Sequence, residues 1–254
     1  MGKSILYKYL DAKGGLMMLY YSNLQFTNAT KFNDPFDCHP ALFDFSNVPE
    51  TKYNWPPKDF LKLKGETDME NQRNNTWISC FSKVYDSLLM WAYYNGHKGV
   101  CIGLNKEALL ECLQYKFFGL YFPFAEEVKY KDIIPKVDYF NEHPSWLELL
   151  TTKAKDWEHE QEVRLITIEP AWIDAKRCIP DEFKGEELVD GKEIRHYPSI
   201  SSDCFESLYL GIKISKEDKE KLIKVAKKLN PNIKIYQMTI DPDALRLKGE
   251  IIES

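Results

Sequence analysis

The segment 157–164, with the sequence WEHEQEVR, holds the residues whose types and spacing are best suited to chemistry. In an extended chain Glu160, Glu162 and Arg164 project from one face, because side chains alternate with a period of two. Two close carboxylates shift each other's pKa, which suits acid–base work or the stabilisation of a cation. A solvated ladder of salt bridges is the alternative interpretation. The three residues open an apolar strand directly after Trp157, so we expect them at a sheet end that a ligand can approach.

A second candidate is the segment 32–37, with the sequence FNDPFD. It predicts first of all a tight turn, because an Asp before Pro avoids the helical region and Pro fixes the next φ. The two flanking phenylalanines are expected to be buried. The alternative interpretation is that Asp34 and Asp37 face a ligand or a metal, with Asn33 beside them in the cleft.

The third candidate is Ser82, at the end of a β-prone run that leads into a helix. Its type and position predict an N-cap for that helix. Because a helix N-terminus attracts anions, the alternative is a place for phosphates. Trp91 is one of the apolar residues that recur at helical spacing in the same helix. Two roles are open for it: packing in the core, or a stacking surface for a cofactor.

These residues must be positioned by an irregular alternation of strands and helices, which predicts an α+β fold: a mainly antiparallel sheet with helices on one side. We expect a single domain over 1–254, with a turn around 13–15, a polar surface excursion at about 47–75 and a loop-rich segment at 169–203. The predicted strands cover 4–10, 77–82, 99–104, 127–130, 162–168, 207–212 and 233–240. The predicted helices cover 85–95, 106–114, 144–157 and 216–229, with Gly96 after the first, Asn105 before the second and Ser215 before the last.

The composition of the 254 residues excludes several classes of protein. Hydrophobic residues make up 44% and charged residues 29%, a composition too apolar for a disordered chain. The net charge of −5 argues against a protein that binds nucleic acid over its whole surface. The surplus of 14 Phe, 15 Tyr and 6 Trp suits one large core.

The scattered cysteines indicate a reducing compartment, and no signal peptide or spanning segment is apparent, so we expect a cytoplasmic protein without a membrane partner. The histidines lack ligand spacing, and no metal is predicted.

Taken together, the motifs resemble the bacterial DUF2971 family, over most of the chain and in the right order. The family name implies no activity, and its general character suggests an accessory or defence role in bacteria or phages. The motifs that carry the resemblance are Leu6–Tyr9 (LYKY), Phe32–Asp37 (FNDPFD), Ser79–Ser82 (SCFS), Met90–Ile102 (MWAYYNGHKGVCI) and Trp157–Arg164 (WEHEQEVR).

A more distant resemblance is to ADP-ribosyltransferase folds. These present Arg or His on a first strand, Ser-Thr-Ser or Tyr at the end of a second, and Glu/Gln-x-Glu at the start of a late one. Here the matching positions are Tyr7-Lys8, Ser82 and Glu160-Gln161-Glu162. The resemblance implies a split, mostly antiparallel sheet, NAD as a substrate and a macromolecular acceptor, either protein or nucleic acid.

The same resemblance implies a role for each matching residue. Glu162 would stabilise the oxocarbenium-like ribose as nicotinamide leaves, and Glu160 would orient or deprotonate the acceptor. Ser82 would hold Glu162 or the ribose, while Tyr7 and Lys8 would face the ribose or the phosphates. The chain departs from the pattern in having Lys in place of Arg or His and a single matching serine.

Two other classes of function remain open. In a metal-dependent nuclease, Glu127 and Lys129 would form an ExK strand, and Asp34 or Asp37 would complete a Mg²⁺ site. In a non-catalytic module, exposed rings and the segment 47–75 would bind a protein or stack the bases of a single-stranded nucleic acid. The transferase hypothesis requires Lys8 and Glu162 to meet Ser82 in one cleft.

Overall fold

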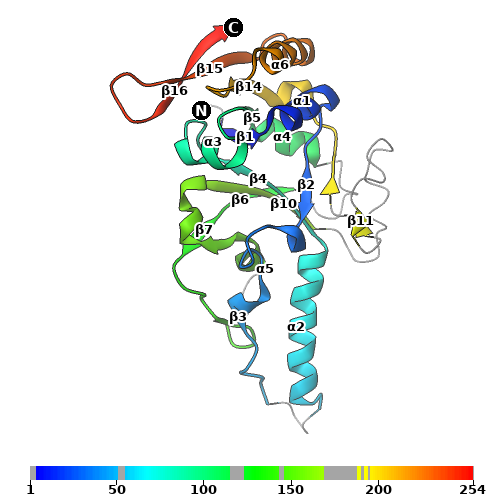
Figure 1. The fold of residues 1–254 in the computed structure, drawn as a ribbon. Coiled ribbons are helices and arrows are strands. Elements are labelled where there is room, and N and C mark those ends of the chain that lie inside the picture. Colours follow the sequence, from blue (N-terminus) through cyan, green and yellow to red (C-terminus); the bar gives the residue numbers. More distant parts are fainter. Residues whose placement is uncertain are drawn as a thin grey trace.

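A computed structural model describes residues 4–50, 55–114, 123–142, 146–168, 188–189, 192–193 and 195–253. Within these ranges the chain forms a ten-stranded sheet with helices packed against it (Figure 1). Its strands pair antiparallel except for one parallel pair. The predicted α+β class with a mainly antiparallel sheet is confirmed.

The large sheet follows one main path, with two further strands beside it. Along the path lie β13 (Arg195–His196), β2 (Phe26–Asn28), β4 (Thr76–Ser82), β1 (Ile5–Leu10), β5 (Val100–Asn105), β14 (Phe205–Leu210), β15 (Lys234–Ile240) and β16 (Leu247–Glu253). β10 (Glu162–Ile168) pairs with β4, and β6 (Phe124–Glu127) pairs with β10. Two-stranded pairs are formed by β3 (Phe43–Asp44) with β8 (Val137–Asp138), β7 (Lys129–Lys131) with β9 (Thr152–Ala154), and β11 (Leu188–Val189) with β12 (Lys192–Glu193).

The helices begin and end largely at the residues that cap them. Asn105 accepts a hydrogen bond at the start of one helix and Ser215 at the start of another, and Gly96 ends a third in the left-handed region, all as predicted. The α-helices are α1 (Ala12–Tyr21), α2 (Lys58–Asn74), α3 (Leu88–Asn95), α4 (Lys106–Leu113), α5 (Trp146–Thr151) and α6 (Lys216–Leu229). Short 3₁₀ helices are η1 (Ala29–Lys31), η2 (Pro40–Leu42), η4 (Lys155–Glu160) and η7 (Ser202–Cys204).

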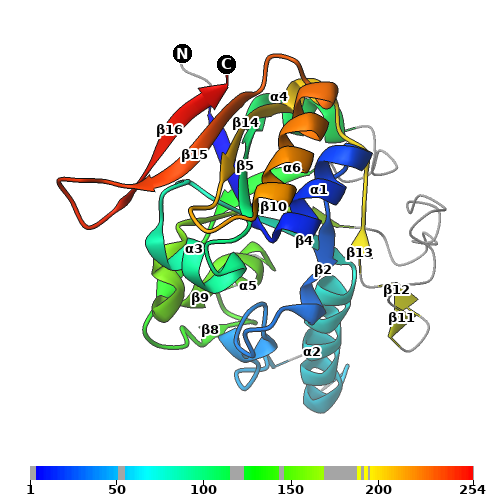
Figure 2. The same cartoon turned by 45° about the horizontal axis from the view of Figure 1, so that its top comes forward.

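The main core lies between the sheet and the helices α1, α4 and α6. Figure 2 shows α1 and α6 side by side, and Leu19 and Leu222 from them are buried against strand residues such as Ile102. The opposite side of the sheet is covered differently along its length: α3 packs there through Trp91, and α5 through Leu150. Helices therefore pack on both sides of the sheet, so the expectation of helices on one side is wrong. The polar site described below lies on the side of α3 and α5.

The sheet is nearly divided between β1 and β4. These two strands pair at one position, Tyr7 opposite Ser82, whereas β1 pairs with β5 at six positions and β4 with β10 at seven. On the same edge, β2 pairs with the start of β4 at Trp77 and Ile78. The interval between them is filled by Lys8, whose Nζ donates to Ser79 Oγ at 3.2 Å and to the Cys80 carbonyl at 3.0 Å.

Local structure departs from expectation in several segments. The turn predicted around 13–15 is part of α1, because the Asp11 carboxylate caps the helix at Gly14 N. Most of the predicted excursion at 47–75 is the helix α2. Ser82 is not a helix N-cap: it ends β4 and accepts from Val84 N, and Ser87 caps α3 instead.

The helix predicted over 144–157 ends at Thr151. The next residues form β9, which pairs in parallel with β7, and then η4. Strand pairing therefore overrides the helical spacing of the apolar residues. The C-terminal strand β16, which forms a hairpin with β15, was not predicted from the sequence. The predicted loop-rich segment 169–203 lies largely outside the described residues. None of the helices in the described ranges has the length and apolar character needed to cross a membrane.

The close approach of Gly99 to the end of β1 gives a first prediction. A Cβ atom at Gly99 would lie 2.1 Å from the Leu10 carbonyl oxygen and 2.6 Å from Asn95 Cβ. Gly99→Ala should therefore lower the free energy of unfolding by about 1–3 kcal/mol, as overpacking does elsewhere, in urea denaturation. Gly14→Ala is the control, because its Cβ would come no nearer than 3.0 Å to another atom, the flexible Asp11 carboxylate, so it should cost less than Gly99→Ala. Equal stability of Gly99→Ala and wild type would contradict this packing.

Candidate functional site

Arg164, on β10, is completely buried and is surrounded by acceptors. Its Nη1 and Nη2 donate to the two carboxylate oxygens of Asp37 at 2.8 and 2.7 Å. Its Nε donates to Glu162 Oε1 at 2.8 Å, Nη2 reaches Glu162 Oε2 at 3.2 Å, and Nη1 also reaches the Leu150 carbonyl at 2.7 Å. Two carboxylates thus bind one guanidinium in fork geometry, the arrangement that best compensates a buried charge.

Lys153, on β9, joins the same carboxylates from another direction. Its Nζ donates to Glu162 Oε2 at 3.0 Å, also binds Glu160, and lies 3.9 Å from Asp37 Oδ2. The Tyr94 hydroxyl of α3 donates to the second oxygen of Glu160. We name the group formed by Asp37, Lys153, Glu160, Glu162 and Arg164 the ionic cluster. Each of its members is buried, so the interpretation of the WEHEQEVR segment as a solvated surface ladder is wrong.

Two local conformations place the carboxylates. Asp37 follows the turn of residues 32–37, in which Asp37 N donates to the Asp34 carbonyl and Phe36 N to the Asp34 carboxylate. Gln161 adopts a left-handed φ of 46°, unusual for a residue with a side chain. Glu160 therefore ends η4 while Glu162 opens β10, so the expectation that both lie on one strand is wrong. Both carboxylates nevertheless reach the same ammonium group.

The environments of the two glutamates move their pKa values in opposite directions. Burial raises the pKa of Glu162, but the charges of Arg164 and Lys153 lower it further, to well below its ordinary value. For Glu160 burial outweighs the attraction of Lys153, and the pKa is raised. One ionised and one more easily protonated carboxylate side by side is the pattern that acid–base sites use.

Tyrosine hydroxyls complete the surroundings of the two carboxylates. The Tyr130 hydroxyl accepts from Glu162 N at 2.8 Å, and burial raises the pKa of Tyr130 to about 12. Burial and the neighbouring Glu160 likewise raise the pKa of Tyr94. Both phenols therefore stay protonated at neutral pH, and Tyr94 remains a donor to Glu160.

A cavity of about 200 Å³ opens against the ionic cluster. It brings together Lys8 from β1, Ser82 from the end of β4 and Glu162 from the start of β10, in a row where Tyr7 pairs with Ser82 and Ser82 with Glu162. Its lining residues are Tyr7, Lys8, Tyr9, Phe32, Asn33, Asp37, Cys80, Phe81, Ser82, Met90, Tyr94, Lys153, Glu160 and Glu162.

Other predicted site residues lie outside this lining. Trp91 is completely buried and its indole N–H donates to the Tyr85 carbonyl, so it packs in the core instead of facing the cavity. Asp34 is buried within its turn, and Arg164 lies behind the carboxylates that it holds. Trp157 contacts the cluster from the side, with its ring 5.1 Å from Lys153 Nζ. Phe36, expected to be buried, is 55% exposed.

Lys153, Tyr94 and Tyr130 are the residues of the candidate site that the sequence did not reveal. Lys153 fell inside a predicted helix, and no motif marks it. Its position depends on the parallel pairing of β7 with β9, which sets Tyr130 directly opposite Lys153. Tyr94 could have been suspected from its place in the MWAYY run after Ser82, although packing was the ordinary expectation there.

The residues proposed for a nuclease site do not meet. The Glu127 carboxylate is 68% exposed and pairs with Lys83 at 2.9 Å, and Lys129 is also exposed. Asp37, by contrast, is buried against Arg164. Within the described ranges, no three His, Cys, Asp or Glu side chains come together in a way that could hold a metal ion.

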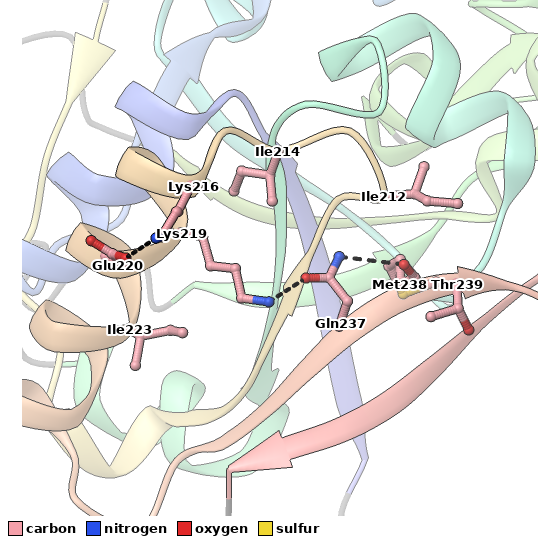
Figure 3. A pocket seen from close by; sticks show the side chains of 9 residues that line it. All are labelled: Ile212, Ile214, Lys216, Lys219, Glu220, Ile223, Gln237, Met238 and Thr239. Carbon is pink, nitrogen blue, oxygen red and sulfur yellow. Dashed lines mark hydrogen bonds and ion pairs between the residues drawn. The ribbon is translucent and has the colours of Figure 1, made fainter.

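A larger and more open hollow, of about 630 Å³, lies between α6 and β15 (Figure 3). Its polar groups pair with one another: Lys219 Nζ donates to Gln237 Oε1 at 2.8 Å, and Lys216 lies 3.9 Å from Glu220. Lys216 and Glu220 are 91% and 68% exposed, so their charges are well solvated. The smaller cavity is therefore the better candidate site, because buried charged groups converge on it.

Removal of the guanidinium of Arg164 should be strongly destabilising. Arg164→Met keeps an apolar stem but leaves Asp37 and Glu162 buried with too little positive charge, so we expect a loss of about 3–5 kcal/mol in the free energy of unfolding. Arg246→Met is the matched control, since Arg246 is 69% exposed and pairs with Asp241 at the surface. Urea denaturation of both variants checks the prediction. Equally small losses would show that the cluster is not a stabilising unit.

The opposite pKa directions predict opposite effects of pH on stability. The lowered pKa of Glu162 means that its stabilisation is present above the ordinary value of 4.5 and is lost as pH falls below that value. The raised pKa of Glu160 means that the folded state takes up a proton above 4.5, so its contribution to stability falls as pH rises from there.

Unfolding free energies of wild type, Glu162→Gln and Glu160→Gln across this pH range test the assignment. The stability advantage of wild type over Glu162→Gln should shrink toward acid pH, and the advantage of Glu160→Gln over wild type should grow as pH rises above 4.5. Parallel curves for the three proteins would refute the separation of the two groups.

Comparison with known proteins finds a match to one family model and no activity. Residues 90–165 match the family model described as "Protein of unknown function (DUF2971)". Neither a curated protein nor a solved structure shows a significant match to the chain. The matched segment begins inside α3, contains β5 and the paired strands β7 and β9, and ends inside β10 at Leu165, so it includes four of the five residues of the ionic cluster. The resemblance to the DUF2971 family predicted from the sequence is thereby confirmed over residues 90–165.

Proposed function

We propose that the protein is an ADP-ribosyltransferase-like enzyme, which cleaves the bond between nicotinamide and ribose in NAD and transfers ADP-ribose to a macromolecule. The observation that carries the proposal is the convergence of Lys8, Ser82 and Glu162 on one cavity. These residues come from the first strand, the end of an early strand and the start of a late one. Their strands β1, β4 and β10 are neighbours in a sheet that is nearly divided at this point.

The electrostatics of the cavity suit a reaction that develops positive charge. The ionic cluster contains three carboxylates and two cations, and Lys8 adds a third cation to the cavity wall, so the negative charge available to the ligand comes from the position of Glu162 and not from the net charge. The lowered pKa of Glu162 keeps its carboxylate charged at neutral pH. When the bond between ribose C1′ and the nicotinamide nitrogen breaks, nicotinamide leaves with the electron pair and the ribose becomes oxocarbenium-like. A fixed carboxylate at the cavity wall stabilises that charge.

Glu160 is placed to act on the acceptor. Its raised pKa brings its proton affinity closer to that needed for general-base catalysis near neutral pH. As the acceptor nucleophile forms its bond to C1′, its proton passes to Glu160. Tyr94 and Lys153 each bind one oxygen of this carboxylate and fix its orientation.

Ser82 and Lys8 line the same cavity as the carboxylates. Ser82 is in register with Glu162, and its hydroxyl already accepts from Val84 N, which leaves its hydroxyl hydrogen to donate to Glu162 or a ribose oxygen. Lys8 holds the edge of β4 through Ser79 and Cys80, and burial lowers its pKa. These two described contacts use two of its three N–H groups, so one is left for the ligand.

The decisive experiment is incubation with NAD while nicotinamide release is followed, in wild type and in Glu162→Gln. We expect Glu162→Gln to lower the rate by ~100-fold or more, the usual cost of removing one preorganised electrostatic group. Glu217→Gln is the matched control, because Glu217 is 76% exposed on α6 and pairs with Lys221 at the surface. Thermal unfolding shows whether Glu162→Gln remains folded.

Two outcomes would overturn the assignment. If wild type releases no nicotinamide with protein or nucleic-acid acceptors and shows no NAD binding in calorimetry, the transferase hypothesis fails, and a non-catalytic binding module becomes the better interpretation. If Glu162→Gln keeps full activity, Glu162 does not stabilise the charge that develops on the ribose.

A further inference from the structure

The cavity is too small to enclose the whole of a dinucleotide. Its volume of about 200 Å³ is below the ~300–1,000 Å³ of pockets that bury ligands of that size or smaller. If the ribose that bears nicotinamide reacts beside Glu162, the adenosine half must lie on an adjoining surface. That surface should offer a flat apolar platform, because adenine is recognised largely by stacking.

Such a platform adjoins the cavity. The rings of Tyr85, Tyr209 and Tyr236, which we name the tyrosine stack, lie nearly parallel. Tyr85 and Tyr209 have centroids 4.3 Å apart with an interplanar angle of 15°, and Tyr209 and Tyr236 are 4.7 Å apart at 11°. Tyr209 is buried between the other two, which are both half-buried and form the ends of the stack.

The sheet itself produces this stack. Tyr209 on β14 and Tyr236 on β15 are direct partners in the parallel pair of strands, which sets their rings side by side. Gly249, on β16, makes room for them, since a Cβ there would lie 3.2 Å from the Tyr209 ring. A side chain at Gly249 would therefore press on the ring at the centre of the stack.

The Tyr85 end of the stack is continuous with the cavity. Tyr7, which lines the cavity, has its ring centroid 5.6 Å from that of Tyr85. Tyr85 is also three residues beyond Ser82, in the segment between β4 and α3. The backbone there is held independently of the Tyr85 ring: the Tyr9 hydroxyl donates to the Val84 carbonyl, and the Trp91 indole donates to the Tyr85 carbonyl.

We propose that Tyr85 is the platform on which the adenine ring of the dinucleotide stacks while its other half occupies the cavity. This inference rests on the proposed function for the identity of the ligand. Tyr236, at the far end of the same stack, is separated from Tyr85 by Tyr209 and serves as an internal control. The two ends have the same chemistry and similar burial, and they differ in their distance from the cavity.

Calorimetric titrations with AMP, nicotinamide mononucleotide and NAD test the proposal in wild type, Tyr85→Leu, Tyr85→Phe and Tyr236→Leu. Tyr85→Leu should weaken binding of AMP and NAD about 5- to 100-fold, the worth of one stacked base, and leave nicotinamide mononucleotide unaffected. Tyr85→Phe, which keeps the ring, should restore binding. Tyr236→Leu should change each affinity by no more than about twofold, as for substitutions away from a site.

Three results would overturn the inference: no binding of AMP by wild type, equal affinities of wild type and Tyr85→Leu for AMP and NAD, or equal losses in Tyr85→Leu and Tyr236→Leu. The proposed function fails separately. A protein that binds AMP through Tyr85, but neither binds nicotinamide mononucleotide nor releases nicotinamide from NAD, would keep the platform and lose the transferase assignment.

Discussion

The arrangement of the site depends on the compensation of one buried charge. Arg164 has no exposed surface, and an isolated guanidinium in such a place would cost several kcal/mol or more. Its donors are satisfied by Asp37, Glu162 and the Leu150 carbonyl, which belong to three separate parts of the chain. The turn at 32–37, the end of α5 and the start of β10 must therefore come together for the chain to fold with Arg164 inside. The cavity is formed where they meet.

The pairing of the buried Arg164 guanidinium with carboxylates divides the ionic cluster into a supporting group and groups that face the cavity. Arg164 lies behind the carboxylates and does not line the cavity, whereas Asp37, Lys153, Glu160 and Glu162 do. Arg164 therefore fixes where the carboxylates lie, and Lys153 binds Glu160 and Glu162 within the cavity lining. With Lys8 included, the cavity lining holds three acidic side chains and two lysines.

The fold was predictable where a local pattern and the tertiary pairing agree. The strand β10 is a mainly apolar run of seven residues and was predicted with the right bounds. The helix caps at Asn105, Ser215 and Gly96 were also predicted, because each acts through contacts within a few residues. The prediction failed at Lys153, where helical spacing continued but a parallel strand pair formed. It also failed at Gln161, whose left-handed φ separates Glu160 from β10. Both depend on partners far along the chain, which one sequence does not reveal.

The near division of the sheet explains why both Ser82 and Lys8 line the cavity. In a continuous sheet the edge of β4 would be paired along its length, and Lys8 would have no carbonyl to bind. Here β1 meets β4 at the single pair of Tyr7 and Ser82, and the Lys8 ammonium satisfies the Cys80 carbonyl beyond it. A charged side chain thus replaces backbone pairing at the point where the cavity opens. The positive charge that completes the sheet edge also becomes part of the cavity wall, so the fold and the electrostatics of the site share one residue.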